Sequence, residues 1–99
     1  TMLTGSRDKT AKLWNVSTGI CLCTFHGHIC SITVAVFFLG GTSVLTASED
    51  KTLKTWSVAS GDCTRTLLGH GAIIRSAMFS SDGVSLLTAS NDKTAKVWD

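Results

Sequence analysis

The sequence predicts an all-β fold made of repeated four-stranded units, and two features carry this prediction. The first is a repeat with a period of 42 residues and no insertion, in which an aspartate and a tryptophan recur in step. The recurring residues are Asp8, Asp50 and Asp92, and Trp14, Trp56 and Trp98. The second is that the apolar residues lie in short alternating runs separated by turn residues, which is the pattern of strands.

The repeat extends well beyond these positions. The segments MLTGSRDKTAKLW, VLTASEDKTLKTW and LLTASNDKTAKVW begin at residues 2, 44 and 86, and they share an Asp-Lys-Thr triplet followed by a lysine and a tryptophan. The Gly-His pair at residues 27 and 28 also recurs at residues 69 and 70. Because so many positions recur in one register, each unit is best interpreted by comparison with the next.

Short strands account for the chain between these markers. SITVAVFF (31–38) is β-branched and aromatic, while SVLTAS (43–48) and TLKTW (52–56) alternate or nearly alternate. Gly40-Gly41 and Asp82-Gly83 indicate hairpin turns, because these residues tolerate positive φ. AIIRSAMF (72–79) alone has a helix-like pattern, but its partner one period earlier is CSITVAVF, which favours a strand.

Composition limits the classes of protein that remain. The 99 residues are 43% hydrophobic, with 16% charged residues and a formal net charge of +2. This charged fraction is below the roughly 25% of an ordinary soluble domain, which predicts that other protein covers part of the surface. No apolar run approaches the roughly 18 residues of a membrane span, so we expect no membrane partner. The chain begins in strand-like sequence and stops one residue after Trp98, as expected of a segment of a longer protein.

These features together resemble the WD-repeat family of β-propellers. The resemblance covers the whole chain and rests on the 42-residue period, the Gly-His pair near one end of each unit and the Trp followed by Asp, Asn or Ser near the other. It implies a partial propeller with four-stranded antiparallel blades, one complete and two incomplete. The whole chain, 1–99, is then one propeller segment, with strands b to d of a first blade in 1–25, a second blade in 29–67 and strands a to c of a third in 71–99. The implied strands are 1–6, 10–14 and 20–25, then 31–38, 43–48, 52–57 and 62–67, then 73–79, 84–90 and 94–98.

The resemblance also implies a hydrogen-bond network inside each blade. In similar blades the Gly-His histidine bonds to a Ser or Thr of strand b, the aspartate of the b–c turn and the indole of the strand c tryptophan. The matching sets are His28, Ser48, Asp50 and Trp56, and His70, Ser90, Asp92 and Trp98. The first blade keeps Ser6, Asp8 and Trp14 without a histidine. Such a network leaves no buried polar group unpaired.

The segment CLCTFHGHIC (21–30) raises the alternative of a metal site. Only two of its five possible ligands, Cys21 and His28, recur one period later; Cys23, His26 and Cys30 align with Arg65, Leu68 and Ala72. Strand alternation places Cys21 and Cys23 on one face and His26 on the other, so the ligands diverge. We therefore expect no metal or other cofactor, cysteines that pack between blades, and reduced thiols in an intracellular protein, cytoplasmic or nuclear. Metal binding remains a remote alternative.

Two further classes are disfavoured. Ser, His and Asp occur within one unit, but no G-x-S-x-G nucleophile turn is present, and the set recurs every 42 residues, as a scaffold does. We therefore expect no enzyme, with a hydrolytic site as a remote alternative. The six lysines occupy two repeating positions, which spreads their charge around the fold instead of forming the patch that nucleic acid requires. They are Lys9, Lys51 and Lys93, and Lys12, Lys54 and Lys96.

The expected function is a non-catalytic scaffold for protein or peptide partners; the alternative is a purely structural segment that completes a propeller or an oligomer. The outer faces of the first and third blades would be bare, so flanking blades or self-association should cover them. In peptide-binding members of the family, contacts come from the residue before the turn aspartate and from the third and fifth residues after the Gly-His histidine. The matching candidates are Arg7, Ser31, Thr33, Glu49, Ile73, Arg75 and Asn91. They differ between units while the scaffold repeats, and Ile73 and Arg75 are the strongest, because bulky apolar groups and arginine often dominate interfaces.

Overall fold

The computed structural model describes residues 1–80 and 82–98. Ser81 within the predicted third blade, and Asp99 at its end, lie outside the described residues. The described chain forms ten strands and one short 3₁₀ helix. They are β1 (Met2–Gly5), β2 (Ala11–Trp14), β3 (Cys21–Phe25), β4 (Ile32–Phe38), η1 (Leu39–Gly41), β5 (Ser43–Ser48), β6 (Leu53–Ser57), β7 (Cys63–Leu67), β8 (Ile74–Phe79), β9 (Leu86–Ser90) and β10 (Ala95–Trp98). This part of the chain contains no helix with the length and hydropathy of a transmembrane segment.

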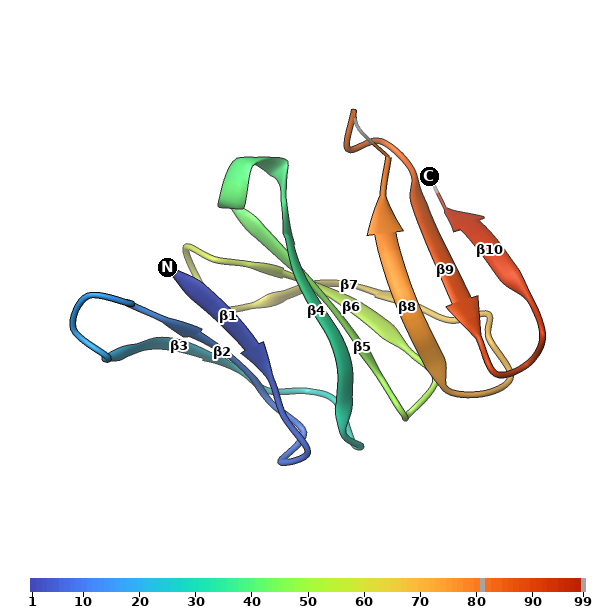
Figure 1. Ribbon diagram of the computed structural model, residues 1–99, viewed down its shortest axis with the longest axis horizontal. Coiled ribbons are helices and arrows are strands. Elements are labelled where there is room, and N and C mark those ends of the chain that lie inside the picture. Colours follow the sequence, from blue (N-terminus) through green and yellow to red (C-terminus); the bar gives the residue numbers. More distant parts are fainter. Residues whose placement is uncertain (81, 99) are drawn as a thin grey trace.

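The strands form three antiparallel sheets, as Figure 1 shows. The first sheet has the order β1-β2-β3, the second β4-β5-β6-β7 and the third β8-β9-β10. This arrangement confirms the predicted fold class of one complete and two incomplete four-stranded blades. The ambiguous segment 72–79 contains the strand β8, because its residues pair in an antiparallel ladder with β9.

The core lies between the sheets, which pack face to face. We call the face of a sheet that contacts the next sheet along the chain its forward face, and the face that contacts the previous sheet its backward face. The first core cluster joins the forward face of the first sheet to the backward face of the second; its buried members are Ala11, Leu13, Phe25, Val44 and Trp56. The second joins the second sheet to the third in the same way; its buried members are Leu45, Ala47, Leu53, Ile74 and Leu86. Because strand side chains alternate, the second sheet supplies Val44 to one core and Leu45 to the other.

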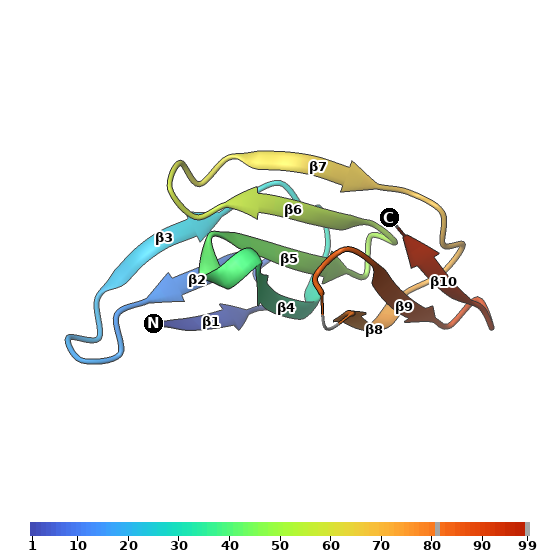
Figure 2. The ribbon, with the colours of Figure 1, turned by 90° about the horizontal axis from the view of Figure 1, so that it is seen from above.

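The first strands of the sheets converge along one side of the molecule. β4 contacts both β1 and β8, and Figure 2 shows these three strands on one side while β3 and β7 lie on the opposite side. A Cβ on Gly5 would lie 2.6 Å from Cγ2 of Ile32, so only glycine permits this approach of β1 to β4. The Thr33 hydroxyl donates to the Ile74 carbonyl at 2.8 Å, which ties the second sheet to the third.

Several of the turns contain residues with positive φ. Gly40, Gly41 and Gly83 have φ of 64, 88 and 73°, as their turn signals predicted. A lysine in each Asp-Lys-Thr triplet also has positive φ, which the sequence did not predict. Lys9, Lys51 and Lys93 have φ of 76, 74 and 71°. This left-handed conformation is unfavourable for lysine, so its threefold recurrence indicates that the rest of the turn imposes it.

The contact between the first and second sheets yields a stability prediction. Phe25 is 1% exposed and its ring centroid lies 5.5 Å from that of Trp56, so Phe25→Ala should lower the free energy of unfolding by about 3–5 kcal/mol. Leu22 on the same strand is 52% exposed, and Leu22→Ala should change it by no more than about 0.5 kcal/mol. Urea unfolding of both variants measures the difference; equal effects would contradict the assigned packing.

Candidate functional site

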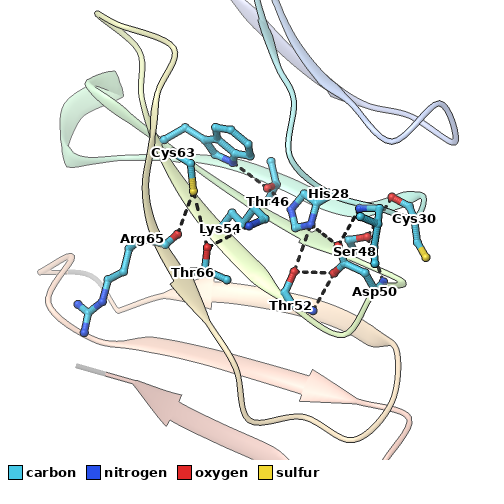
Figure 3. Close-up of polar contacts among 12 residues, drawn as sticks. His28, Cys30, Thr46, Ser48, Asp50, Thr52, Lys54, Cys63, Arg65 and Thr66 are labelled. Atoms are coloured by element: carbon cyan, nitrogen blue, oxygen red, sulfur yellow. Dashed lines mark hydrogen bonds and ion pairs between the residues drawn. The ribbon is translucent and has the colours of Figure 1, made fainter.

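A series of hydrogen bonds joins four side chains of the second sheet and the segment before it (Figure 3). The Trp56 indole Nε1 donates to Thr46 Oγ1 at 2.9 Å, and Thr46 Oγ1 lies 2.7 Å from His28 Nε2. His28 Nδ1 lies 2.8 Å from Asp50 Oδ2. An indole only donates and an ionised carboxylate only accepts, which assigns the remaining protons. The Thr46 hydroxyl donates to Nε2, and a neutral His28 donates from Nδ1 to Asp50.

Asp50, in the β5–β6 turn, is the last residue in this series of hydrogen bonds. Its Oδ1 accepts from the backbone amide and the hydroxyl of Thr52, at 2.9 and 2.5 Å. Its Oδ2 also accepts from the Ile29 amide at 3.1 Å. Burial alone would raise the pKa of this carboxyl, but the hydrogen bonds from Thr52, His28 and Ile29 outweigh it and lower the pKa. Asp50 therefore stays ionised and holds the turn against the segment before β4.

His28 is held neutral by its surroundings. Its side chain is 1% exposed, and burial lowers its pKa more than the neighbouring Asp50 carboxylate raises it. The Lys54 ammonium lowers the pKa further. A neutral imidazole is also what the Thr46 hydroxyl requires, because Nε2 accepts its proton.

The other two sheets contain versions of the same network. In the third sheet, Trp98 Nε1 donates to Thr88 Oγ1 at 3.0 Å, and His70 lies 2.7 Å from that oxygen and 3.0 Å from Asp92. Hydrogen bonds from Thr94, then from the Gly71 amide, lower the pKa of Asp92. In the first sheet, Trp14 Nε1 donates to Thr4 Oγ1 at 2.8 Å and Thr10 bonds to Asp8.

The structure corrects the predicted hydroxyl partners of both histidines. The hydroxyl of Ser48 is bonded elsewhere than to His28: it accepts from the Asp50 amide and donates to the Cys30 carbonyl, at 3.1 and 3.0 Å. Ser90 occupies the corresponding turn position beside Asp92. Thr46 and Ser48 point to the same face of β5, but Thr46 lies diagonally across from Trp56, whereas Ser48 lies at the turn. No signal in the sequence separates the two, because the threonine and the serine each recur three times in the aligned segments.

The order threonine, histidine and aspartate matches that of a nucleophile, a base and its orienting acid. The environment of Thr46 differs from that of a catalytic nucleophile, because Thr46 is 0% exposed and its oxygen already accepts a hydrogen bond from the Trp56 indole. A nucleophile must reach the carbonyl it attacks. This arrangement holds β5, β6 and the segment before β4 together and offers no access to a substrate.

The cysteine and histidine cluster of residues 21–30 is dispersed. Cys21 is exposed and its thiol donates to the Cys23 carbonyl at 3.5 Å, whereas His28 is committed to the buried network. Within residues 1–80 and 82–98, no three His, Cys, Asp or Glu side chains are grouped to hold a metal ion. The predicted packing of the cysteines between blades is wrong for Cys21 and Cys63, which are exposed; Cys23 does lie in the first core, against Gly61.

The turns and strand starts that carry the candidate partner-binding residues lie at one end of the molecule, which is the lower end in Figure 1. The β1–β2, β5–β6 and β9–β10 turns meet the starts of β4 and β8 there. The turn residues Arg7, Glu49 and Asn91 are exposed. The amides of Glu49 and Asn91 donate to the carbonyls of Ser31 and Ile73, both at 2.9 Å. We call this end, with Arg7, Ser31, Glu49, Ile73, Arg75 and Asn91, the turn rim.

Two of the candidates have specific contacts. Arg75 is exposed and its Nε donates to Asn91 Oδ1 at 3.1 Å, which holds the guanidinium along the turn rim. Thr33 is partly buried, and its hydroxyl is used in the contact with Ile74 between sheets. Thr33 is therefore better placed to join the sheets than to meet a partner.

Comparison with known proteins accounts for the repeated networks. The model of the WD40 family, described as WD domain, G-beta repeat, matches residues 1–15, 19–57 and 61–99. The chain belongs to the WD40 family. Each matched WD40 repeat ends directly after a tryptophan of the network, and the second match includes β3 of the first sheet together with β4 to β6 of the second. Sequence repeat and sheet are thus offset by one strand.

One relative shows how local the similarity is. The chain is 48% identical over 40 residues to the protein named Lissencephaly-1 homolog from Branchiostoma floridae. The match covers 40% of this chain and 10% of that protein. The match supports the assignment of the repeat, and it covers too little of the relative to transfer that protein's function to this chain.

The network yields a second prediction. Thr46→Val keeps the shape of the side chain but removes the oxygen that accepts from Trp56 and the proton that His28 accepts. Leaving buried polar groups unpaired costs about 1–3 kcal/mol, so the free energy of unfolding should fall by that amount. The matched control is Thr64→Val, because Thr64 is an exposed strand threonine. Urea unfolding that showed the same loss for both variants would contradict the central place of Thr46.

The lowered pKa of His28 yields a third prediction. In the unfolded chain the imidazole takes up a proton as the pH falls through its ordinary pKa of 6.5, whereas folded His28 resists protonation. The contribution of neutral His28 to the free energy of unfolding is complete above the ordinary pKa. It is lost as the pH falls toward the lowered pKa of the folded state. Melting temperature should therefore drop between about pH 7.5 and pH 5.5. His28→Gln should flatten this dependence and the exposed-site control His26→Gln should not; identical profiles for the two would refute the assignment.

Proposed function

We propose that this WD40 segment is a non-catalytic platform that binds proteins or peptides through its turn rim. WD40 repeats generally act as protein-interaction scaffolds, which supports the class of function. The proposal assigns that function to particular side chains of this chain. It also assigns no catalysis to the buried networks, because their hydroxyls are already bonded inside the sheets.

The observation that carries the proposal is a contrast between backbone and side chains at the turn rim. The backbone bond from the turn residue to the start of the first strand is the same in the second and third sheets, at 2.9 Å in each. The exposed side chains on this frame differ, with Arg7, Glu49 and Asn91 at one repeated position. A rigid frame with varied exposed side chains suits recognition, because little conformational entropy is lost when a partner binds.

The chemistry of the turn rim indicates the kind of partner. Arg75 and Ile73 lie beside Asn91 on the third sheet, and Glu49 lies beside Ser31 on the second. An arginine next to an apolar side chain favours a partner with an acidic and an apolar group close together. Glu49 favours a basic group further along the same partner, so an extended peptide of mixed charge fits best.

The alternative function is a structural segment that completes a propeller and binds nothing at the turn rim. Either role suits a reducing, intracellular compartment, which we propose because Cys21, Cys23, Cys30 and Cys63 are all free thiols. The two functions differ in what they require of Arg75 and Glu49, since a structural segment needs neither.

The turn rim is tested with peptides selected against the chain from a random display library. The double variant Arg75→Ala with Glu49→Ala should weaken their binding by about tenfold or more, because it removes charged contacts from the interface. Its melting temperature should stay unchanged, since exposed substitutions usually alter stability by less than about 0.5 kcal/mol. The matched control is Arg65→Ala with Asp62→Ala, which removes the same two charges from exposed positions off the turn rim. Selected peptides that bind both double variants equally well would support the structural alternative.

A further inference from the structure

Arg75 is the extra residue of a β-bulge at the turn rim. The ladder of β8 with β9 shifts between Ile74 and Ser76, so Arg75 has no residue opposite it. A bulge takes a residue out of the ladder and redirects its side chain. The Arg75 guanidinium lies beside the β9–β10 turn, where its Nε donates to Asn91 Oδ1 at 3.1 Å.

The second sheet contains the same bulge and uses it differently. The ladder of β4 with β5 shifts between Ile32 and Val34, which makes Thr33 the extra residue. The Thr33 hydroxyl donates to the Ile74 carbonyl of the third sheet, so the bulged residue joins two sheets there. In the third sheet the bulged residue is an exposed arginine bonded to a turn side chain. The bulge therefore recurs as backbone geometry, whereas the chemistry that it presents does not.

Asn91 orients Arg75 without cancelling its charge. The Asn91 side chain accepts through a neutral amide oxygen. Among the described residues, ion pairs are formed by the two network histidines with their aspartates, and Arg75 takes part in none. One period earlier the position of Asn91 is Glu49, and a carboxylate beside Arg75 would form an internal ion pair. The amide thus leaves the guanidinium charge available to another group.

The backbone around this pair is fixed by three further hydrogen bonds. The Asn91 amide donates to the Ile73 carbonyl at 2.9 Å. The Ser90 hydroxyl lies 3.1 Å from the carbonyl oxygens of both Ala72 and Ile73. The start of β8 and the β9–β10 turn are therefore held together on either side of Arg75. With Nε bonded to Asn91, the two terminal nitrogens of the guanidinium are left as a planar fork, which matches the two oxygens of a carboxylate.

We propose that Asn91 is a positioning residue that holds the Arg75 fork to bind a side-chain carboxylate of a peptide on the turn rim. This inference rests on the proposed function and names the group that the third sheet recognises. Holding the guanidinium before the partner arrives reduces the conformational entropy lost on binding. Asn91 is then a support for Arg75 rather than a contact of its own.

The test uses peptides selected against the chain from a random display library, each also made with Gln or Asn in place of its acidic residues. Calorimetry on the unaltered chain should show binding of the acidic versions tighter by about tenfold or more. Asn91→Ala should reduce this preference by about threefold or more, because one hydrogen bond no longer holds the guanidinium. Asn91→Asp should remove most of it, because the new carboxylate pairs with Arg75. Arg75→Lys should also reduce it, since an ammonium has no planar fork.

The matched control is Ser17→Asp, which adds the same charge in the exposed β2–β3 turn away from the turn rim and should leave the preference unchanged. Melting temperature should stay the same in all these variants, so a loss of preference would not reflect unfolding. A phosphoserine version of each peptide tests the oxyanion: binding tighter than the glutamate version by more than about tenfold would overturn the assignment to a carboxylate. Selected peptides without acidic residues would overturn it as well.

Failure of this inference differs from failure of the proposed function. If Arg75→Ala with Glu49→Ala leaves peptide binding intact, the turn rim is not the binding surface and both fail. If that double variant weakens binding while Asn91→Ala and Asn91→Asp keep the full preference for acidic peptides, the proposed function stands and the positioning role of Asn91 is wrong.

Discussion

The hydroxyl of Thr46 is the point on which the second sheet depends, because one buried oxygen satisfies two rings that could not otherwise be buried. It accepts from the Trp56 indole and donates to His28, which in turn donates to Asp50. These bonds fix the Trp56 ring in the plane it needs to pack against Phe25 of the first sheet. The polar interior of one sheet therefore determines how the next one docks, and an apolar residue at position 46 would leave the Trp56 indole N–H and His28 Nε2 without a partner.

The same bonds explain why the turns are rigid enough to present side chains. Asp50 is bonded to Thr52 on one side and to Ile29 on the other, so the β5–β6 turn is connected to the start of the sheet's first strand. The lysine in this turn takes positive φ because the aspartate and threonine around it are already fixed. Internal structure that holds a turn in one conformation leaves its exposed side chains to vary without a penalty in stability. The repeat thus separates a fixed framework from exposed side chains that vary, which is what the proposed partner binding requires.

Most of the fold could be predicted from the sequence, since a 42-residue register identifies strands and turns that no single segment shows clearly. The residues around 72–79 are an example: their own pattern is ambiguous, and the partner segment decided it. The choice between Thr46 and Ser48 could not be made in this way, because both recur and both lie on the same face of β5. Only the pairing of β5 with β6 places one of them diagonally across from Trp56. The exposure of Cys21 was likewise missed, because the pairing of β2 with β3 is irregular between Cys23 and Cys21, and simple alternation does not predict such a bulge.

Repetition also clarifies which exposed residues carry information. An exposed Leu87 means little by itself, since single apolar residues are common on protein surfaces. It acquires meaning because Leu45, the same position one period earlier, is fully buried by a sheet of known composition. Arg75 is informative for the opposite reason, since its counterpart Thr33 bonds to the third sheet and the position is not held constant. An exposed residue whose counterparts are buried lies on a face that a neighbouring sheet covers elsewhere in the repeat, and an exposed residue whose counterparts differ is a candidate for the proposed partner binding.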